Sequence, residues 1–190
     1  WPPTVIDIGG GAGALSRAIV NRRKGVLATL VELPEVLQAA RELYPAEREW
    51  TGIRTIAADF RSHAFNTNRR FGIVLLSNCL HAYGWDEACA LLEKGIRLLA
   101  PGGVLLIHDY FPDRRGCHPH KGALYDLAMM LNTYNGMCHH ASRVVGFLEG
   151  CGLPAVRVQD LKTDSSIILV GNQPGSLDGL DEHNIWIRRA

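Results

Sequence analysis

A run rich in glycine follows directly after the first apolar segment of the chain. Residues 4–8 are largely apolar and β-branched, and Gly9, Gly11 and Gly13 come immediately afterwards. Glycine has no Cβ atom, so the backbone of this run can bend sharply and approach a ligand closely. A helix that begins just after the run would direct its free N–H groups at the same place. We therefore predict a ligand-binding turn at residues 9–13.

Two acidic residues end the next two apolar segments. Glu32 closes residues 26–32, about 20 residues after the glycines, where an acid can accept hydrogen bonds from both hydroxyls of a ribose. Asp59 follows residues 53–57 and is placed to contact the amino group of an adenine, with Phe60 beside the ring. The three segment ends together predict a site for an adenosine-containing ligand.

The glycine spacing by itself is compatible with two classes of enzyme. Gly9-x-Gly11-x-x-Ala14 also satisfies the dinucleotide-binding fingerprint, which leaves an NAD-dependent oxidoreductase open. Asp7 favours the other class, because a pyrophosphate gains nothing from a carboxylate so close by. Asp7-x-Gly9-x-Gly11-x-Gly13 resembles the first motif of class I methyltransferases. In that motif the acid helps to position the methionine part of S-adenosylmethionine.

These residues need a framework of strands that all end on one side. Short apolar runs predict strands, and apolar residues at helical spacing between them predict helices. The predicted strands are 4–8, 26–32, 53–57, 73–77, 104–110, 156–160 and 167–170, and the predicted helices are 15–20, 34–44, 85–99, 121–133 and 142–149. Alternation of this kind is typical of an α/β fold, a doubly wound and mostly parallel sheet. A polar link between the last two strands also permits a hairpin.

Several further motifs narrow the resemblance to one family. The chain resembles the catalytic domain of the small-molecule O-methyltransferases typified by caffeate and hydroxyindole methyltransferases. The matching stretches are Val5-Ile6-Asp7-Ile8-Gly9-Gly10-Gly11-Ala12-Gly13, Glu32-Leu33-Pro34-Glu35-Val36, Ala58-Asp59-Phe60, Leu76-Ser77-Asn78-Cys79-Leu80-His81 and Leu99-Ala100-Pro101-Gly102-Gly103. The resemblance implies a seven-stranded, Rossmann-like sheet with the last strand antiparallel.

The resemblance also implies the cofactor and the domain arrangement. The cofactor would be S-adenosylmethionine, with S-adenosylhomocysteine as the product. Besides the glycine turn, the residues that would line the cofactor are Asp7, Glu32, Leu33, Asp59, Phe60, Ser77 and Asn78. Residues 1–172 would form the catalytic domain and residues 173–190 a C-terminal extension. An N-terminal winged-helix dimerisation domain would precede them, so we expect the intact protein to be a homodimer.

One histidine falls where the family has its catalytic base. His81 lies just beyond the predicted strand 73–77, and imidazole titrates near neutrality, so it can remove a proton from a hydroxyl group. The plant enzymes orient this histidine with two glutamates. The first corresponds to Asp109, which keeps the charge on a shorter side chain, and the second corresponds to Cys138, which does not.

A helix and the segment after it carry the residues that we expect to line the acceptor pocket. These are Met129, Asn132, Cys138 and His139. A concentration of histidine and cysteine surrounds them, and it raises the alternative of a metal site. Its members are His108, Asp109, Cys117, His118, His120, Cys138, His139 and His140. Their spacings match no standard zinc pattern, so we expect no functional metal.

Composition excludes several other classes of protein. The net charge of +1 argues against a surface that grips phosphate backbones, so no nucleic-acid partner is expected. No apolar stretch approaches the roughly 20 residues needed to cross a bilayer, so no membrane association is expected. Five cysteines without CxxC spacing fit a cytoplasmic enzyme with reduced thiols. The chain begins at Trp1 rather than methionine and enters a strand almost at once, so we expect an upstream segment.

The sequence thus predicts transfer of a methyl group from S-adenosylmethionine to a hydroxyl of a small, aromatic or polyketide-like molecule, with His81 as the general base. Two alternatives remain open. One moves the methyl group to nitrogen, carbon, sulfur or a tetrapyrrole side chain, because the second glutamate is missing. The other is a cofactor-binding accessory protein that has lost catalysis.

Overall fold

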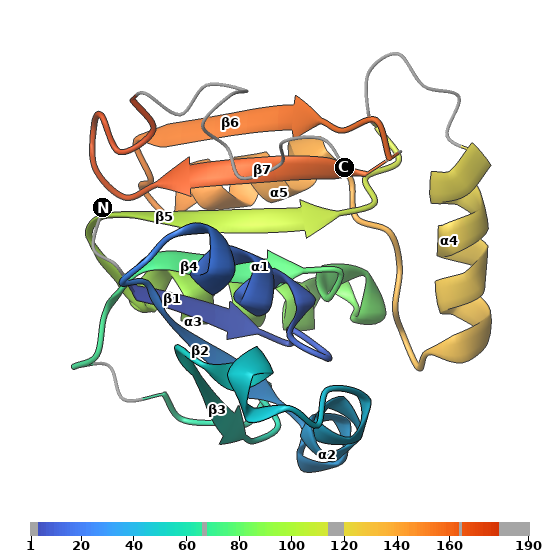
Figure 1. Ribbon diagram of the computed structural model, residues 1–190. Coiled ribbons are helices and arrows are strands. Elements are labelled where there is room, and N and C mark those ends of the chain that lie inside the picture. The colour runs from blue at the N-terminus through green and yellow to red at the C-terminus, as the bar shows by residue number, and fades with distance from the viewer. Residues whose placement is uncertain (1–3, 66–67, 114–119, 164, 179–190) are drawn as a thin grey trace.

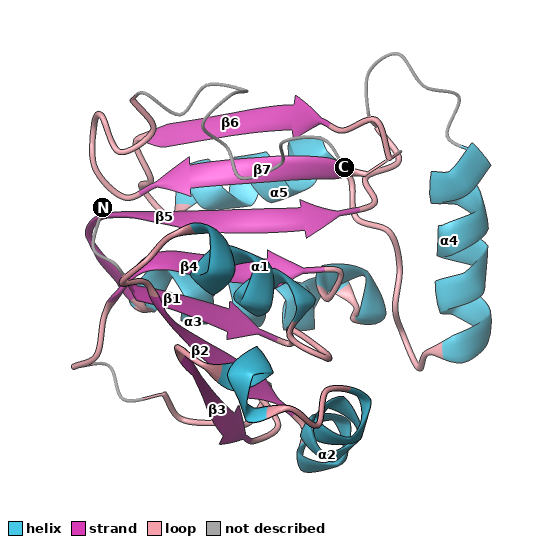
Figure 2. Cartoon of the chain, in the orientation of Figure 1, coloured by secondary structure: helices cyan, strands magenta, loops and turns pink. Residues whose placement is uncertain are grey.

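Helices cover both faces of a central sheet (Figures 1 and 2). The computed structural model describes residues 4–65, 68–113, 120–163 and 165–178. The seven strands are β1 (Thr4–Ile8), β2 (Leu27–Glu32), β3 (Ile53–Ala57), β4 (Phe71–Ser77), β5 (Leu99–Asp109), β6 (Ala155–Asp160) and β7 (Ser166–Gly171). The helices are α1 (Ala14–Arg22), α2 (Pro34–Leu43), α3 (Trp85–Arg97), α4 (His120–Asn132) and α5 (Ala141–Gly150), with 3-10 turns η1 (Glu47–Trp50) and η2 (Leu80–Ala82).

The strand order is β3-β2-β1-β4-β5-β7-β6. The first five strands of this order run parallel, and β7 pairs antiparallel with both β5 and β6. The predicted α/β class, the doubly wound sheet, its antiparallel last strand and the terminal hairpin are therefore confirmed. The order reverses between β1 and β4, and ligands of such sheets bind beyond the carboxyl ends of the strands near this point.

Apolar side chains on the two faces of the sheet bury different helices. Ala28 and Leu30 point to the same face of β2, and they belong to the clusters that bury Ile19 of α1 and Leu37 of α2. Val31 points to the other face, in the large cluster that holds α3 and α5. A sheet covered on both faces accounts for strands such as β4, in which six consecutive residues are buried.

The largest difference from the predicted boundaries lies between α3 and β5. Strand β5 begins at Leu99, five residues before the predicted start at residue 104, and α3 ends at Arg97 rather than at residue 99. The residues Pro101–Gly103 were expected to separate helix from strand, yet they lie inside β5. Gly102 has a φ angle of 72°, and the pairing with β4 shifts between Phe71 and Ile73, so a local irregularity accommodates them.

Two peripheral segments differ in how they meet the sheet. Helix α4 stands apart from the layers and comes closest to the turn η2 (Figure 1). In contrast, the chain beyond β7 folds back, and Leu177 packs against Val104 and Leu169. The first part of the expected C-terminal extension therefore docks on the sheet, while residues 179–190 and the start at Trp1 lie outside the described residues. Within the described ranges, no helix has both the length and the apolar character to span a bilayer.

Candidate active site

The glycine turn after β1 is open on one side and tightly packed on the other. The N–H of Gly9 donates to the Val31 carbonyl oxygen (2.9 Å), which fixes the start of the turn beside β2. Gly11 has a φ angle of 56°, and a Cβ atom at this position would meet nothing within 4 Å. A Cβ atom on Gly10 would lie 2.5 Å from Cγ of Asp7, so only glycine fits there. The open side is a place where a ligand can approach the backbone.

Asp7 is a buried carboxylate directly beneath this turn. The Ser16 hydroxyl donates to Oδ2 of Asp7 (2.8 Å), whereas the buried Oδ1 has no hydrogen-bond partner among the described residues. Burial raises the pKa of Asp7 from its ordinary 3.8 to about 6, against the effect of the Ser16 hydrogen bond, and the nearby charge of Glu32 adds a little. An unpaired buried carboxylate oxygen fits a positively charged donor.

Glu32 joins the end of β2 to the glycine turn. Its side chain is buried, with Oε2 accepting the Gly11 N–H (3.0 Å) and Oε1 accepting the Leu33 N–H (2.8 Å). Leu33 precedes α2, so Glu32 holds both flanking backbones. Each carboxylate oxygen has a further lone pair, and the carboxylate can still accept hydrogen bonds from hydroxyl groups of a ligand.

Asp59 and Phe60 lie after β3, as the sequence predicts, but Asp59 also has a partner that sequence reasoning missed. Arg61 binds its carboxylate through the backbone N–H (2.9 Å) and through Nη2 (2.8 Å), and these hydrogen bonds lower the pKa of Asp59. Phe60 is buried and packs on the glycine turn, its ring carbon 3.1 Å from where a Cβ of Gly9 would lie. Lys94 of α3 donates to the carbonyl oxygens of Phe60 and Arg61.

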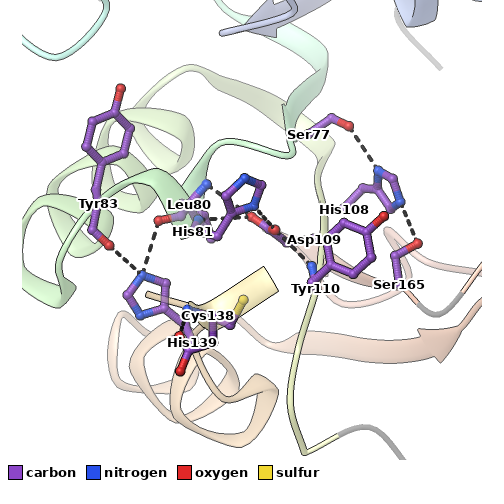
Figure 3. Close-up of polar contacts among 11 residues, drawn as sticks. Ser77, Leu80, His81, Tyr83, His108, Asp109, Tyr110, Cys138, His139 and Ser165 are labelled. Atoms are coloured by element: carbon purple, nitrogen blue, oxygen red, sulfur yellow. Dashed lines mark hydrogen bonds and ion pairs between the residues drawn. The ribbon is translucent and has the colours of Figure 1, made fainter. Parts of the chain in front are cut away.

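His81 and Asp109 form a buried pair at the ends of β4 and β5 (Figure 3). Nδ1 of His81 lies 2.5 Å from Oδ1 of Asp109. The other oxygen, Oδ2, accepts the N–H groups of Leu80 (3.1 Å) and His81 (3.3 Å), and Oδ1 also accepts the N–H of Tyr110 (2.8 Å). A carboxylate surrounded by donors acts only as an acceptor, so the proton of the imidazole lies on Nδ1. Nε2 remains available to accept a proton.

Two tyrosines form an aromatic wall beside His81. The rings of Tyr110 and Tyr125 stack with their centroids 4.1 Å apart. Tyr125 comes from α4, and its ring meets the His81 ring edge-on at 5.3 Å. Neither tyrosine is part of a recognisable motif, and only their proximity in the folded chain identifies them. A wall of this kind suits a planar, apolar ligand.

Ser77 is the last residue of β4, and Asn78 follows it at the start of the turn. Oγ of Ser77 lies 3.0 Å from Nδ1 of His108, and Nε2 of the same ring lies 2.8 Å from Oγ of Ser165. Burial lowers the pKa of His108, which favours the neutral ring that donates to one serine and accepts from the other. Asn78 adopts a φ angle of 52°, a conformation that asparagine tolerates, and this lets the chain turn sharply towards His81.

The four residues predicted for the acceptor pocket lie in two settings. Met129 is half-buried on α4, and the exposed Asn132 caps its own helix by donating to the Ala128 carbonyl oxygen. Cys138 and His139 are buried, at 2% and 3% exposure. Burial raises the pKa of Cys138 to about 12, so its thiol stays protonated and does not replace a carboxylate. Their roles towards an acceptor stay predictions.

The histidines of the candidate metal group have separate hydrogen-bond partners. His108 bonds to two serines, whereas Nε2 of His139 faces two carbonyl oxygens. In the part of the chain that the structure describes, no three side chains of metal-ligating type gather into a site. Cys117 and His118 lie outside that part.

Comparison with known proteins gives a consistent family. Residues 3–154 match the family model of the O-methyltransferase domain. The chain is 29% identical over 180 residues to acetylserotonin O-methyltransferase of Rattus norvegicus, covering 93% of this chain and 40% of that protein. It is 30% identical over 155 residues to 3-hydroxy-5-methyl-1-naphthoate 3-O-methyltransferase of Streptomyces sahachiroi, covering 80% and 44%.

A solved structure agrees with these sequence matches. The crystal structure of human N-acetylserotonin methyltransferase in complex with S-adenosylmethionine superposes with a TM-score of 0.75 at 25% identity, covering 90% of this chain and 47% of that one. The chain therefore spans less than half the length of the proteins that it matches here. With four-fifths of its residues inside the family model, this chain belongs to the O-methyltransferase domain family.

Proposed function

We propose that this chain is the catalytic domain of an enzyme that transfers a methyl group from S-adenosylmethionine to a hydroxyl group of a small aromatic molecule. The observation that carries the proposal is the buried His81–Asp109 pair, which lies one strand away from the glycine turn. The relatives of this chain include O-methyltransferases named for a hydroxylated naphthoate and for acetylserotonin. The wall of Tyr110 and Tyr125 supports a planar aromatic acceptor.

The residues around the turn fit the proposed cofactor. Oδ1 of Asp7 lacks a partner and suits the ammonium group of the methionyl part, and Glu32 suits the ribose hydroxyls. Asp59 would accept from the adenine amino group if Arg61 yields one oxygen, with Phe60 packed beside the ring. When bound, S-adenosylmethionine supplies a methyl group that its sulfonium charge has already activated. Ser77, Asn78 and Leu33 complete the proposed lining.

The protein's own chemical task is then to align the acceptor and to remove its proton. Nε2 of His81 takes the proton as the oxygen begins to bond to carbon, and Asp109 stabilises the resulting imidazolium through Nδ1–H. A phenol has a pKa near 10, so a positioned base contributes about 10²–10⁴-fold at neutral pH. Alignment in a site without bulk water contributes as well.

Product analysis tests this proposal. The protein is incubated with S-adenosylmethionine carrying a deuterated methyl group and with a panel of naphthols, hydroxyindoles, anilines and thiols. Methyl ethers identified by mass spectrometry are the expected products. N- or S-methylated products would support the alternative of methyl transfer to nitrogen or sulfur. Cys138 motivates this alternative, because its protonated thiol does not supply the second carboxylate. Binding of S-adenosylhomocysteine without any turnover would support an accessory role, and no binding would refute the cofactor.

Cofactor affinity is expected to depend on pH through Asp7. The ionised carboxylate attracts the ammonium group, and the pKa of about 6 in the free protein means that Asp7 is ionised above pH 6. Affinity for S-adenosylhomocysteine therefore approaches its full value about one unit above pH 6 and falls about tenfold per unit well below pH 6, as protons compete for Asp7. Calorimetry between pH 5 and pH 8 measures this. Asp7→Asn should bind more weakly with a flatter profile, and an unchanged profile would exclude Asp7 as the titrating group.

We also propose that the intact protein is a homodimer in the cytoplasm, with residues 1–172 as the catalytic domain and 173–190 as an extension. Support for the dimer comes from an apolar surface on and just after α4. Its exposed members are Leu124, Leu127, Met130, Leu131, Tyr134 and Met137. Exposed apolar side chains that gather on one part of a protein surface often mark an interface. No nucleic-acid or membrane partner is proposed.

A charge placed on this surface tests the dimer. In the intact protein, Leu131→Asp is expected to give a monomer in light scattering without loss of cofactor binding, because burying an unpaired carboxylate in an apolar interface is costly. Leu43 of α2 is similarly exposed but lies elsewhere, so Leu43→Asp serves as the matched control. If both the Leu131→Asp and the Leu43→Asp variants remain dimeric, the interface must lie elsewhere.

A further inference from the structure

The segment between α4 and α5 packs closely on the turn that carries His81. The N–H of Gly84 donates to Oδ1 of Asn135 (3.2 Å). A Cβ atom on Gly136 would lie only 2.7 Å from the carbonyl oxygen of His81, so the two backbones meet directly. Cys138 is fixed in turn, because its N–H donates to Oδ1 of Asp126 on α4 (2.7 Å). The segment is thus held at both the turn and the helix.

His139 makes the most buried polar contacts between this segment and the turn. Its Nε2 lies 3.2 Å from the carbonyl oxygen of Leu80 and 3.0 Å from that of Tyr83 (Figure 3). Two carbonyl oxygens accept only, so Nε2 carries a proton and donates to both. Nδ1 is buried without a partner among the described residues, and burial lowers the pKa of His139, so the ring is neutral.

We propose that His139 is a positioning residue for the general base. The carbonyls that it binds flank His81 in the sequence, one residue before and two residues after it. On the opposite side, Asp109 binds the N–H groups of Leu80 and His81 and the imidazole itself. Asp109 therefore holds the donors of the turn and His139 holds its acceptors. The backbone of the turn that carries the imidazole is thus held from two sides.

The inference rests on the proposed role of His81. A residue that positions His81 has a different kinetic effect from a residue that contacts the acceptor. A residue that touches the acceptor would change KM, and would do so differently for acceptors of different shape. A residue that acts through His81 lowers kcat alike for all acceptors that need the base. A small displacement of a catalytic group lowers the rate of the reaction rather than the affinity for the acceptor.

Two substitutions with the same amide chemistry but different reach test the proposal. Glutamine places its NH₂ group near the position of Nε2, so His139→Gln keeps the donor for both carbonyls. Asparagine places the same group near Nδ1, so His139→Asn leaves them without a partner. The neighbouring His140 has an exposed side chain, and His140→Asn is the matched control. Turnover of two naphthols, binding of S-adenosylhomocysteine, and the NMR signal of the His81 Nδ1 proton are measured for each.

We expect His139→Asn to lower kcat about tenfold for both naphthols, with KM and cofactor affinity unchanged, and to weaken the Nδ1 proton signal by faster exchange. His139→Gln should retain both kcat and the signal. Equal behaviour of the Gln and Asn variants, or a change confined to KM, would overturn the proposal. If the wild-type protein methylates no hydroxyl compound of the panel, the proposed function fails, and the NMR comparison still decides whether His139 fixes His81.

Discussion

Replacing His81 with alanine is expected to lower kcat for a phenolic acceptor by about 10²–10⁴-fold, the contribution of a positioned general base. The geometry supports a loss in this range because Asp109 occupies Nδ1, which leaves Nε2 as the proton acceptor. The affinity for S-adenosylhomocysteine should not change, since Asp7 and Glu32 lie on other strands. Steady-state kinetics and calorimetry measure the two quantities separately. His140→Ala, at an exposed histidine, is the control.

The acidity of the acceptor sharpens this prediction. A nitro-substituted phenol is already ionised in mildly alkaline buffer and needs no base, so His81→Ala should lose much less activity with it than with an unsubstituted naphthol. Asp109→Asn is expected to act through the same histidine, because an amide can stabilise the tautomer with its proton on Nε2. Equal losses for both acceptors would mean that His81 serves alignment and not proton removal.

The site residues at the carboxyl ends of strands could be predicted from the sequence, because the end of a parallel strand defines where the residue lies in the sheet. The glycine turn, Glu32 and Asp109 all lie where an apolar run stops, and parallel strands bring these ends to one edge. The residues that contact them were not predicted from the sequence. Ser16 contacts Asp7 from the first turns of α1, and Tyr125 reaches His81 from a distant helix. Neither residue interrupts a pattern or belongs to a motif.

His139 illustrates the limit most clearly. The sequence marks it only as one member of a group rich in histidine and cysteine, and predicts that it lines the acceptor pocket. Its contacts with Leu80 and Tyr83 join residues almost 60 positions apart, and they depend on how the segment before α5 crosses the His81 turn. Such crossings are set by the packing of irregular segments, which leaves no periodicity in the sequence. Only the folded chain shows these contacts, and from them we infer that His139 positions His81.

Glu32→Gln is expected to weaken the binding of S-adenosylhomocysteine about 100-fold. Hydrogen bonds to a charged group contribute about 1.5–3 kcal/mol each, and two ribose hydroxyls would share this carboxylate. Burial at 7% exposure keeps water from screening the loss. The amide adds a second effect, because its NH₂ group would face either the Gly11 N–H or the Leu33 N–H, donor against donor. Calorimetry at pH 7.5, where Asp7 is ionised, isolates the contribution of Glu32.

The control must separate the ribose contact from the stability of the turn. Glu35 lies three residues further on, exposed at the start of α2, so Glu35→Gln removes the same charge from the same neighbourhood without touching the turn. Glu32→Asp keeps the charge on a shorter side chain and should bind with intermediate affinity. If Glu32→Gln and Glu35→Gln weaken binding equally, general electrostatic attraction would explain the effect. If Glu32→Gln binds like the wild-type protein, the carboxylate serves only to brace Gly11, and the ribose must be held by other groups.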